Sequence, residues 1–321
     1  MSLEVLAPGL LTTVQDAGRF GHRAAGIGTA GALDAYSRQV ANLLVGNTAD
    51  AALLEISLQG PRLRFRSAVR IALCGAEIEA SAGSSKLPGW RPIDLPAGSE
   101  LHLGACRSGC RAYLAVAGGI AVPQVLGSRS TDLRGGFGGL DGRALRAGDR
   151  LPLVDGLAAH TGSTPIIASW WIDPTPDLPF AASTLVRVLP GRDAPVPGDA
   201  WTREDFRVAT ASNRQGLRLE GPELRVTDTR ERISEPVVPG TVQLPPAGQP
   251  IVLLADAQTV GGYPRIGQVI AADLPRLAQL RPGDLLRFEG IDAERARTLA
   301  CQQRQRLARI ALAIEQRLSQ R

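Results

Sequence analysis

The sequence predicts a mainly β fold with small helices (α+β), built as two related barrel-like β domains followed by a C-terminal helix. Three observations lead to this prediction. The chain has 321 residues, which is long enough for two domains. Its 36 glycines and 23 prolines favour many short strands joined by turns. Patterns from the first half also recur in the same order in the second half.

The recurring patterns indicate that the two domains are related. LQGPRLRF at residues 58–65 and LEGPELRV at 219–226 are identical at five of eight positions. Similarly, LRAGDRL at 145–151 matches LRPGDLL at 280–286. Because several matches in one order are not expected by chance, we interpret the chain as a duplication.

Local patterns place the main elements. Runs of apolar and β-branched residues predict strands at 70–73, 101–103, 113–117, 185–189 and 251–255. A helix is expected at 34–45, because Asp34 can cap it, one face is apolar and Gly46 can end it. A short helix should follow Asp273, and residues 291–321 predict an amphipathic helix.

These elements divide the chain into a first domain at 1–160, a linker at 161–184, a second domain at 185–290 and a helix at 291–321. The division allows for a strand exchanged between the two domains. A cleft between duplicated domains is a common place for a substrate, so we expect the site there. The apolar stripe of the final helix either covers the chain's own barrel or contacts a partner.

Composition argues against several function classes. The 36 basic and 31 acidic residues give a net charge of +5, and the arginines are scattered, so no nucleic-acid partner is expected. Lys86 is the only lysine and GxxxxGK(S/T) is absent, which weighs against a Schiff base or a classical phosphate loop. Without a signal-peptide pattern or a membrane-spanning run, we expect a cytoplasmic protein with no membrane partner.

The cysteines and histidines do not form a metal-binding pattern. The four cysteines include no CxxC pair, and His22, His102 and His160 lack the spacing of metal ligands. We therefore predict no zinc site, and we expect the cysteines to be reduced.

The most informative stretch is DAQTVGGYPRIGQVI at 256–270, which follows the apolar run at 251–255. Its adjacent glycines permit backbone conformations closed to other residues, or close approach to a ligand. The side chains displayed around this turn would be those of Asp256, Gln258, Thr259 and Tyr263. Such a loop after a strand is typical of a binding surface, and the alternative is an ordinary glycine turn.

Three other glycine-containing stretches are rich in polar residues: TTVQDAGRFG at 12–21, GIGTAGALD at 26–34 and GSRSTDLRGGFGGLDG at 127–142. In the second stretch, backbone amides at a helix N-terminus can face an anion, or Asp34 serves only as the helix cap. In the third, Arg129 and Arg134 can hold a carboxylate or phosphate, or they pair with neighbouring aspartates.

Glu55 lies in an apolar run, where burial raises the pKa of a carboxyl group unless the group is paired. It is therefore either an arginine partner or a general acid or base. The candidate catalytic residues are Asp256, Glu55, Asp132 and Tyr263. The candidate substrate-binding residues are Arg19, Asp34, Arg129, Thr131, Arg134, Arg214, Gln258 and Thr259.

The longer motifs together resemble one bacterial family. They include GLLTTVQDAGRFG, GALDAYSRQVANLLVGN, LGSRSTDLRGGFGGLDGRAL, SNRQGLRLEGP and PVVPGTVQLPPAGQPIVLLADAQTVGGYPRIGQVI. These are similar to the family of the 5-oxoprolinase C subunit, also called allophanate hydrolase subunit 2, KipA-like or biotin-dependent carboxyltransferase subdomain A and B. The resemblance implies two cyclophilin-like β-barrel domains.

For 5-oxoprolinase, the resemblance implies opening of 5-oxoproline to glutamate through ATP-dependent phosphorylation of the lactam, together with a partner, the B subunit, and the A subunit. Related urea carboxylase domains pass a carboxyl group from biotin to urea, and KipA-like members antagonise a kinase inhibitor. The shared motifs do not separate these branches. We predict the first, and keep a biotin-dependent carboxyltransferase and a non-enzymatic regulator as alternatives.

The predicted chemistry assigns roles to the candidate residues. Arg129, Arg134 and the amides of the glycine-rich loop would stabilise the transferred phosphoryl group, and Asp256 or Glu55 would bind Mg²⁺ or orient the amide. Since the chain lacks a phosphate loop, we expect the B subunit to complete the ATP site.

Overall fold

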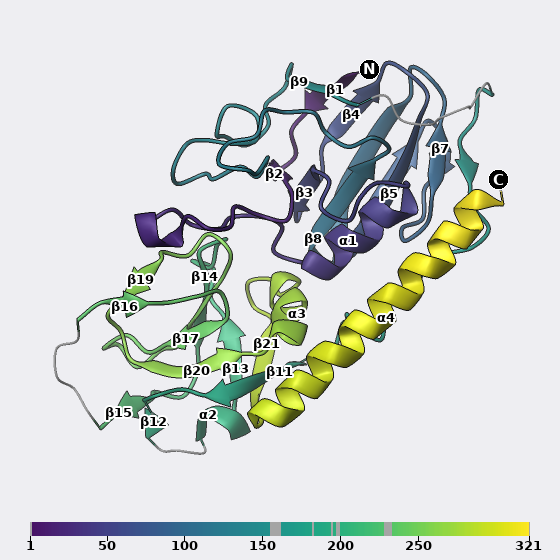
Figure 1. Cartoon of the computed structure of the whole chain (residues 1–321). Coiled ribbons are helices and arrows are strands. Elements are labelled where there is room, and N and C mark those ends of the chain that lie inside the picture. Colours follow the sequence, from purple (N-terminus) through teal and green to yellow (C-terminus); the bar gives the residue numbers. More distant parts are fainter. Residues whose placement is uncertain are drawn as a thin grey trace. The chain divides into compact units, whose positions relative to one another are not determined.

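The computed structural model describes residues 2–154, 162–181, 183–193, 195–196, 200–227 and 233–320 (Figure 1). The chain divides into two compact units. The first comprises Met1–Arg19, Ala30–Pro176 and Arg306–Arg321, and the second comprises Phe20–Thr29 and Asp177–Gln305. The described residues do not include His160, which precedes the expected domain boundary, or Thr161 and Ala182 of the expected linker.

A 10-stranded sheet forms the centre of the first unit. Its strands are β1 (Ser2–Ala7), β2 (Leu11–Gln15), β3 (Leu53–Ser57), β4 (Arg62–Phe65), β5 (Val69–Ala82), β6 (Ser85–Lys86), β7 (Ile93–Leu95), β8 (Glu100–Val116), β9 (Arg150–Pro152) and β10 (Ile166–Ile167). The order is β10-β7-β5-β8-β4-β1-β9, while β2 pairs with β3, β3 with β8 and β6 with β5. β10 lies in the expected linker and joins this sheet through β7.

Helix α1 (Ala35–Leu44) packs against β5 and β8 (Figure 1). It forms where the sequence predicts, because the Asp34 carboxylate accepts a hydrogen bond from the Ser37 amide at 2.8 Å. Val40 is fully buried on the face toward the sheet. Gly46, with φ at 80°, follows the last turn and lets the chain leave the helix.

One strand of the first unit is longer than predicted. The stretches 101–103 and 113–117, expected as separate strands, both belong to β8, which pairs with β5 along most of its length. Gly104 and Gly109 lie between the two stretches. Gly109 has φ at 75° within the strand, and shifts in the pairing register with β5 mark bulges that accommodate it.

The second unit contains a closed barrel in the order β11-β20-β17-β18-β14-β13-β21. These strands are β11 (Ser183–Pro190), β13 (Asp205–Val208), β14 (Gly216–Glu220), β17 (Thr241–Gln243), β18 (Ile251–Leu253), β20 (Arg265–Val269) and β21 (Leu285–Gly290). Two two-stranded sheets accompany it, β12 (Pro195–Val196) with β15 (Arg225–Val226) and β16 (Glu235–Pro236) with β19 (Val260–Gly261). Its helices are η1 (Arg23–Ala25), α2 (Ala200–Arg203), η2 (Ala271–Asp273) and α3 (Leu274–Ala278), and α3 is the predicted short helix.

The duplicated turn pattern has a matching position in both units. LRAGDRL, at 145–151, leads into β9, which pairs with β1. LRPGDLL, at 280–286, leads into β21, which pairs with β11. In both cases the strand after the turn therefore pairs with the first long strand of its unit. The pairing is antiparallel in the first unit and parallel in the second.

Helix α4 (Ala293–Ser319) confirms the predicted C-terminal helix. Its residues up to Gln305 belong to the second unit and those from Arg306 onward to the first. Ile314, on the apolar stripe of this helix, is buried, whereas Leu312, which is not part of that stripe, is exposed. The apolar stripe is therefore covered by the chain at Ile314.

Candidate functional site

In the first unit, a buried carboxylate joins two of the predicted polar loops. Asp16 accepts hydrogen bonds at 2.6 Å from the hydroxyls of both Ser128 and Ser130, and from the backbone amides of Arg129 at 2.5 Å and Gly18 at 2.9 Å. Burial raises the pKa of the Asp16 carboxyl, but these four hydrogen bonds outweigh burial and bring the pKa below its ordinary value. Asp16 is therefore a charged anchor between the segment that follows β2 and the 127–142 loop.

Arg19 is a second anchor of the same loops. It is fully buried, and its guanidinium donates to the carbonyls of Val125 at 3.0 Å and Ser130 at 2.9 Å. The guanidinium also lies over the Phe137 ring, 4.6 Å from its centroid. A Cβ on Gly138, whose φ is +72°, would lie 2.2 Å from the Ser130 carbonyl oxygen and 2.7 Å from Arg19 Nη2, so a glycine is required there. These contacts support a positioning role, and direct binding of substrate by Arg19 remains a prediction.

The remaining candidates of this loop differ in accessibility. Thr131 is buried and donates its hydroxyl to the Val14 carbonyl at 3.0 Å. Arg129 is half-buried, and its Nε donates to the Val122 carbonyl at 2.9 Å. Asp132 is half-buried, whereas Arg134 is exposed and forms no ion pair with any described residue.

The glycine-rich loop uses much of its own backbone internally. Asp132 Oδ1 accepts from the amides of Arg134 at 3.1 Å and Gly135 at 2.8 Å. The amides of Gly136 and Gly139 donate to backbone carbonyls of the same loop. These amides are thus already satisfied, which does not fit the expected cradle for a phosphoryl group. The Arg134 guanidinium is the accessible cation that this loop presents.

A buried network surrounds Glu55. Its Oε2 accepts from the Leu33 amide at 2.8 Å and from the Tyr113 hydroxyl at 2.9 Å, and Arg111 Nε lies 3.9 Å from Oε1. The Tyr113 hydroxyl in turn accepts from the Asp34 amide at 2.8 Å. Burial, followed by the nearby Glu55 and Asp34 charges, raises the pKa of Tyr113 well above its ordinary value. Glu55 therefore has an arginine partner, and Asp34 caps helix α1. For both residues, the structure contains the non-catalytic alternative that the sequence left open.

In the second unit, Asp256 and Arg214 form a buried bidentate ion pair. Their atoms meet at 2.8 Å (Nε–Oδ2) and 2.9 Å (Nη2–Oδ1), and the side chains are 6% and 5% exposed. The ion pair holds the start of the 256–270 stretch in place. It also occupies the Asp256 carboxylate, one of the two carboxylates predicted to bind Mg²⁺. Thr259 is buried, while Tyr263 is half exposed to solvent.

The predicted site residues do not include a buried glutamine that is present in each unit. Gln15 on β2 and Gln243 on β17 are almost fully buried. Gln15 Oε1 and Gln243 Nε2 have no hydrogen-bond partner among the described residues. The signal was the triplet Thr-Val-Gln, which occurs at 13–15 and again at 241–243. A side-chain amide offers both a donor and an acceptor, the groups that a lactam also presents.

Gly261 lies directly against Gln243. A Cβ at Gly261 would be 2.6 Å from Gln243 Nε2, closer than real Cβ atoms come to other heavy atoms. Gln258 donates to Gln243 Oε1 at 3.4 Å. Of the two adjacent glycines in the 256–270 stretch, Gly261 therefore allows the backbone to approach the buried side-chain amide of Gln243 closely.

The predicted site residues fall into two groups. The first unit contains Asp34, Glu55, Arg19 and the 127–142 loop. The second unit contains Arg214 and the 256–270 stretch. A single pocket containing both groups stays a prediction. Within the described ranges, no cluster of His, Cys, Asp or Glu has the arrangement of a metal site. No helix in those ranges combines the length and apolarity needed to cross a membrane.

Comparison with known proteins identifies the class. Residues 25–290 match the family model "Carboxyltransferase domain, subdomain A and B". The chain belongs to this carboxyltransferase domain family, as the sequence resemblance predicted.

Three relatives show the range of this family. The chain is 42% identical to the 5-oxoprolinase C subunit of Escherichia coli over 92% of its length and 93% of the relative. It is 36% identical to the 5-oxoprolinase C subunit of Haemophilus influenzae, covering 89% of this chain and 90% of the relative. The crystal structure of the K. lactis urea amidolyase superposes with a TM-score of 0.86 and 29% identity, covering 96% of this chain but 20% of that one.

Proposed function

We propose that the chain is the C subunit of an ATP-dependent 5-oxoprolinase, which opens 5-oxoproline to glutamate together with its B and A subunits. The observation that carries this proposal is the 42% identity to a protein of that name over 93% of its length. The urea amidolyase shares only one fifth of its own chain with this protein, and at 29% identity.

The proposed reaction requires activation of a stable amide. Phosphorylation of the lactam oxygen, which ATP supplies, turns that oxygen into a leaving group. Water then adds to the activated carbon and the ring C–N bond breaks. Hydrolysis of the resulting acyl phosphate releases phosphate and glutamate.

The described residues support parts of this chemistry. Arg134 is exposed and able to approach a phosphoryl oxygen, and Asp132 keeps Oδ2 outside its turn hydrogen bonds. Glu55 and Asp256 are held by buried hydrogen bonds and ion pairs, so metal binding by either would require breaking those contacts. No nucleotide cradle is evident in the described loops of the first unit, and we therefore assign completion of the ATP site to the partner.

The experiment is reconstitution of the complex. The chain, co-purified with its B and A partner subunits, should release ADP and glutamate only when 5-oxoproline is added. The chain alone should show negligible ATP turnover. A complete complex without 5-oxoproline-dependent turnover would refute the proposal, and robust turnover by the chain alone would refute the shared ATP site.

Arg134 provides the residue-level test in that complex. Arg134→Ala should lower kcat about 10- to 100-fold, because one charge-assisted hydrogen bond is worth roughly 1.5–3 kcal/mol. Arg150→Ala, which removes another exposed arginine of the first unit, is the matched control and should leave kcat unchanged. Equal rates in both variants would exclude Arg134 from the reaction.

A biotin-dependent carboxyltransferase acting on urea or a similar amide is the second candidate. The name of the matching family model and the superposition on urea amidolyase favour it. This function requires a biotinylated partner, so its activity should be abolished by avidin. Tight binding of a partner similar to the B subunit, with neither activity, would instead identify a non-enzymatic regulator.

A further inference from the structure

The first unit contains a pocket of about 570 Å³ that none of the candidate site residues line. Its position follows from the strand pairing beside β5. The Leu87 amide donates to the Ala80 carbonyl at 2.9 Å and the Trp90 amide to the Leu73 carbonyl at 2.7 Å. Between these two bonds β5 runs from Leu73 to Ala80, whereas the returning segment runs only from Leu87 to Trp90. The two segments therefore separate and leave a hollow.

At one end of this pocket, the strand register aligns four polar side chains into one row. Ser81 on β5 is directly opposite Lys86 on β6 and His102 on β8. His102 is in turn directly opposite Arg62 on β4. Residues directly opposite each other in an antiparallel pair have Cβ atoms about 4.5–5.5 Å apart on the same face of the sheet. These four residues, the polar row, therefore lie side by side across four strands.

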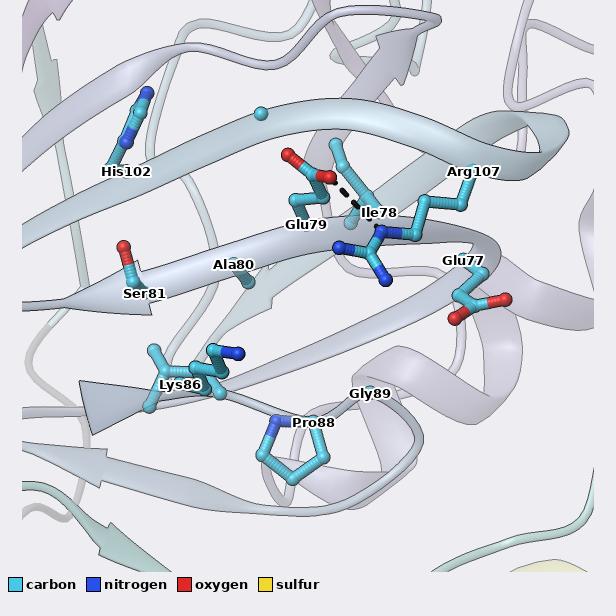
Figure 2. A pocket seen from close by; sticks show the side chains of 12 residues that line it. Glu77, Ile78, Glu79, Ala80, Ser81, Lys86, Pro88, Gly89, His102 and Arg107 are labelled. Carbon is cyan, nitrogen blue, oxygen red and sulfur yellow. Dashed lines mark hydrogen bonds and ion pairs between the residues drawn. The ribbon is translucent and has the colours of Figure 1, made fainter.

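The polar row lies on the face of the sheet that points away from the core. Leu63, Ala82 and Leu101, which neighbour members of the row along their strands, are buried in the core. Because successive side chains of a strand point to opposite faces, the row faces solvent. Figure 2 shows its three members that line the pocket, Lys86, Ser81 and His102, at the same end. Ser81 is half-buried, and the other members of the row are exposed.

The two cations of the polar row are not neutralised by the chain. Lys86 and Arg62 form no ion pair with any described residue. Glu100 lies two residues from His102 on the same face of β8, but its carboxylate accepts a hydrogen bond from Arg64 at 2.6 Å. The pKa of Glu100 is accordingly lowered first by that hydrogen bond and more weakly by the charge of Arg62. The row therefore has an excess of positive charge.

The carboxylates that line the pocket do not compensate this charge. Glu79 pairs with Arg107, its Oε1 lying 3.0 Å from the arginine Nε (Figure 2). Glu77 is four residues before the row along β5, which corresponds to roughly 13 Å at 3.3 Å per residue of strand. An anion at the row would therefore meet two cations, a hydroxyl and an imidazole.

We propose that the polar row binds a phosphate dianion, either inorganic phosphate or the phosphate group of a small molecule. The Ser81 hydroxyl and a ring nitrogen of His102 would donate to it, and Lys86 and Arg62 would pair with its oxygens. A ligand above the boundary between β5 and β8 is about 7 Å from the Cβ atoms of both cations, within reach of these long side chains and a hydrogen bond of about 2.8 Å. A monocarboxylate fits less well, because it would leave one cation without a counter-charge.

The single lysine of the chain makes a direct experiment possible. Reductive methylation with ¹³C-formaldehyde labels only Lys86 and the N-terminal amine, and the dimethylated lysine keeps its positive charge. The Lys86→Arg variant lacks the lysine signal and so identifies it. Inorganic phosphate at about pH 8, where it is mainly a dianion, should shift the Lys86 signal in a saturable manner. Because the cations are exposed, the expected dissociation constant is roughly millimolar.

Other anions test the preference for a dianion. Sodium chloride at the same ionic strength should give no saturable shift, and acetate should bind about fivefold or more weakly than phosphate. Equal affinities for acetate and phosphate would overturn the proposal, as would the absence of saturation by phosphate up to about 50 mM. Glycerol 3-phosphate distinguishes the two sources. Binding tighter than that of phosphate indicates a phosphate ester whose organic part occupies the pocket, and equal or weaker binding indicates inorganic phosphate.

Paired variants of the β5–β6 hairpin test the hydroxyl. Ser81→Ala should weaken phosphate binding about two- to fivefold, because it removes one hydrogen bond to the ligand. Ser85→Ala is the matched control, since Ser85 is directly opposite the core residue Ala82 and so lies on the other face of the same hairpin. It should bind phosphate like the parent chain. Equal affinities in the two variants would show that the row does not hold the ligand.

A second pair of variants tests the cation outside the pocket. Arg62→Gln should weaken phosphate binding about two- to fivefold. Arg150→Gln removes the same charge from an exposed position on β9 of the same sheet and should bind phosphate like the parent chain. If Arg62→Gln has no effect, or Arg150→Gln weakens binding equally, the effect of charge is not local to the row and the proposal is wrong. Circular dichroism of each variant confirms that the chain remains folded.

Discussion

Replacing Asp16 by asparagine should destabilise the first unit strongly, although the substitution changes neither size nor shape. The Asp16 carboxylate accepts at both oxygens, from Ser128, Ser130 and Gly18 at Oδ1 and from the Arg129 amide at Oδ2. An asparagine in either orientation places an NH₂ group against at least one of these donors. The remaining hydrogen bonds also lose their charge assistance.

The expected magnitude follows from these contacts. Losing a hydrogen bond to a charged group costs about 1.5–3 kcal/mol, and a buried donor left unsatisfied costs about 1–3 kcal/mol. Allowing for partial rearrangement of the two serine hydroxyls, Asp16→Asn should lower the free energy of unfolding by roughly 2–4 kcal/mol. The loss should be measured by urea unfolding followed by fluorescence and circular dichroism, with separate transitions fitted separately.

Asp132→Asn is the matched control in the same loop. Both of its turn hydrogen bonds, from the amides of Arg134 and Gly135, go to a single oxygen, Oδ1. An asparagine can keep both, so the free energy of unfolding should change by less than about 0.5 kcal/mol. If the two variants lose equal stability, or Asp16→Asn loses less than about 0.5 kcal/mol, the anchor role of Asp16 is refuted.

The effect of Asp16 should also depend on pH in one direction. Its folded-state pKa is lowered from the ordinary 3.8, so the unfolded chain binds the proton more readily. The stability from the carboxylate is therefore fully present above the unfolded pKa, and it is lost as pH falls through the folded pKa. The stability difference between the parent and Asp16→Asn should stay constant from about pH 7 to 5 and shrink below the ordinary pKa. A difference that grows on acidification would contradict this sign.

Two further predictions concern the second unit. Gly261→Ala should lower the free energy of unfolding by about 1–3 kcal/mol in thermal or urea unfolding, because the new Cβ would press on the buried Gln243 amide. Gly290→Ala is the control, because its new Cβ would meet open space, and it should be neutral or slightly stabilising. If the two variants lose equal stability, the contact between the Cβ at position 261 and Gln243 is relieved and the prediction is wrong. Asp256→Ala should cost about 3–5 kcal/mol in urea unfolding because it leaves Arg214 buried without its partner. Unchanged stability with abolished turnover of the complex would instead assign Asp256 to catalysis.

Much of the fold could be predicted because its signals are local. The cap at Asp34 and the glycine at position 46 define α1, and the periodic stripe defines α4. The long strand β8 could not be predicted in the same way. Gly104 and Gly109 have the local pattern of a turn, but pairing with β5 and with β3 and β4 continues the strand past them, with a bulge at Gly109. Such pairing depends on residues distant in sequence, so a local pattern does not contain it.

The candidate residues of the site were chosen for their chemical type, which does not specify what they contact. A carboxylate on a loop can anchor the loop or act on a ligand, and only the distances distinguish the two. Arg19 and Glu55 turned out to be buried and held by neighbouring groups. Gln15 and Gln243 were not chosen as candidates because a glutamine is ordinary in composition, although the repeated Thr-Val-Gln triplet that contains them is visible in the sequence.

The accessible polar groups bear on how the proposed reaction is divided between the chains of the complex. Once the buried anchors are set aside, Arg134 and Tyr263 are the exposed candidates, while Arg129, Asp132 and Gln258 are half-buried. One accessible arginine is too little to neutralise a triphosphate, and the neighbouring glycine amides are used within their own loop. Phosphorylation of a lactam therefore needs further cations and backbone donors. In the proposed complex we expect the partner chain to supply them, so ATP turnover should appear only when the chains are combined.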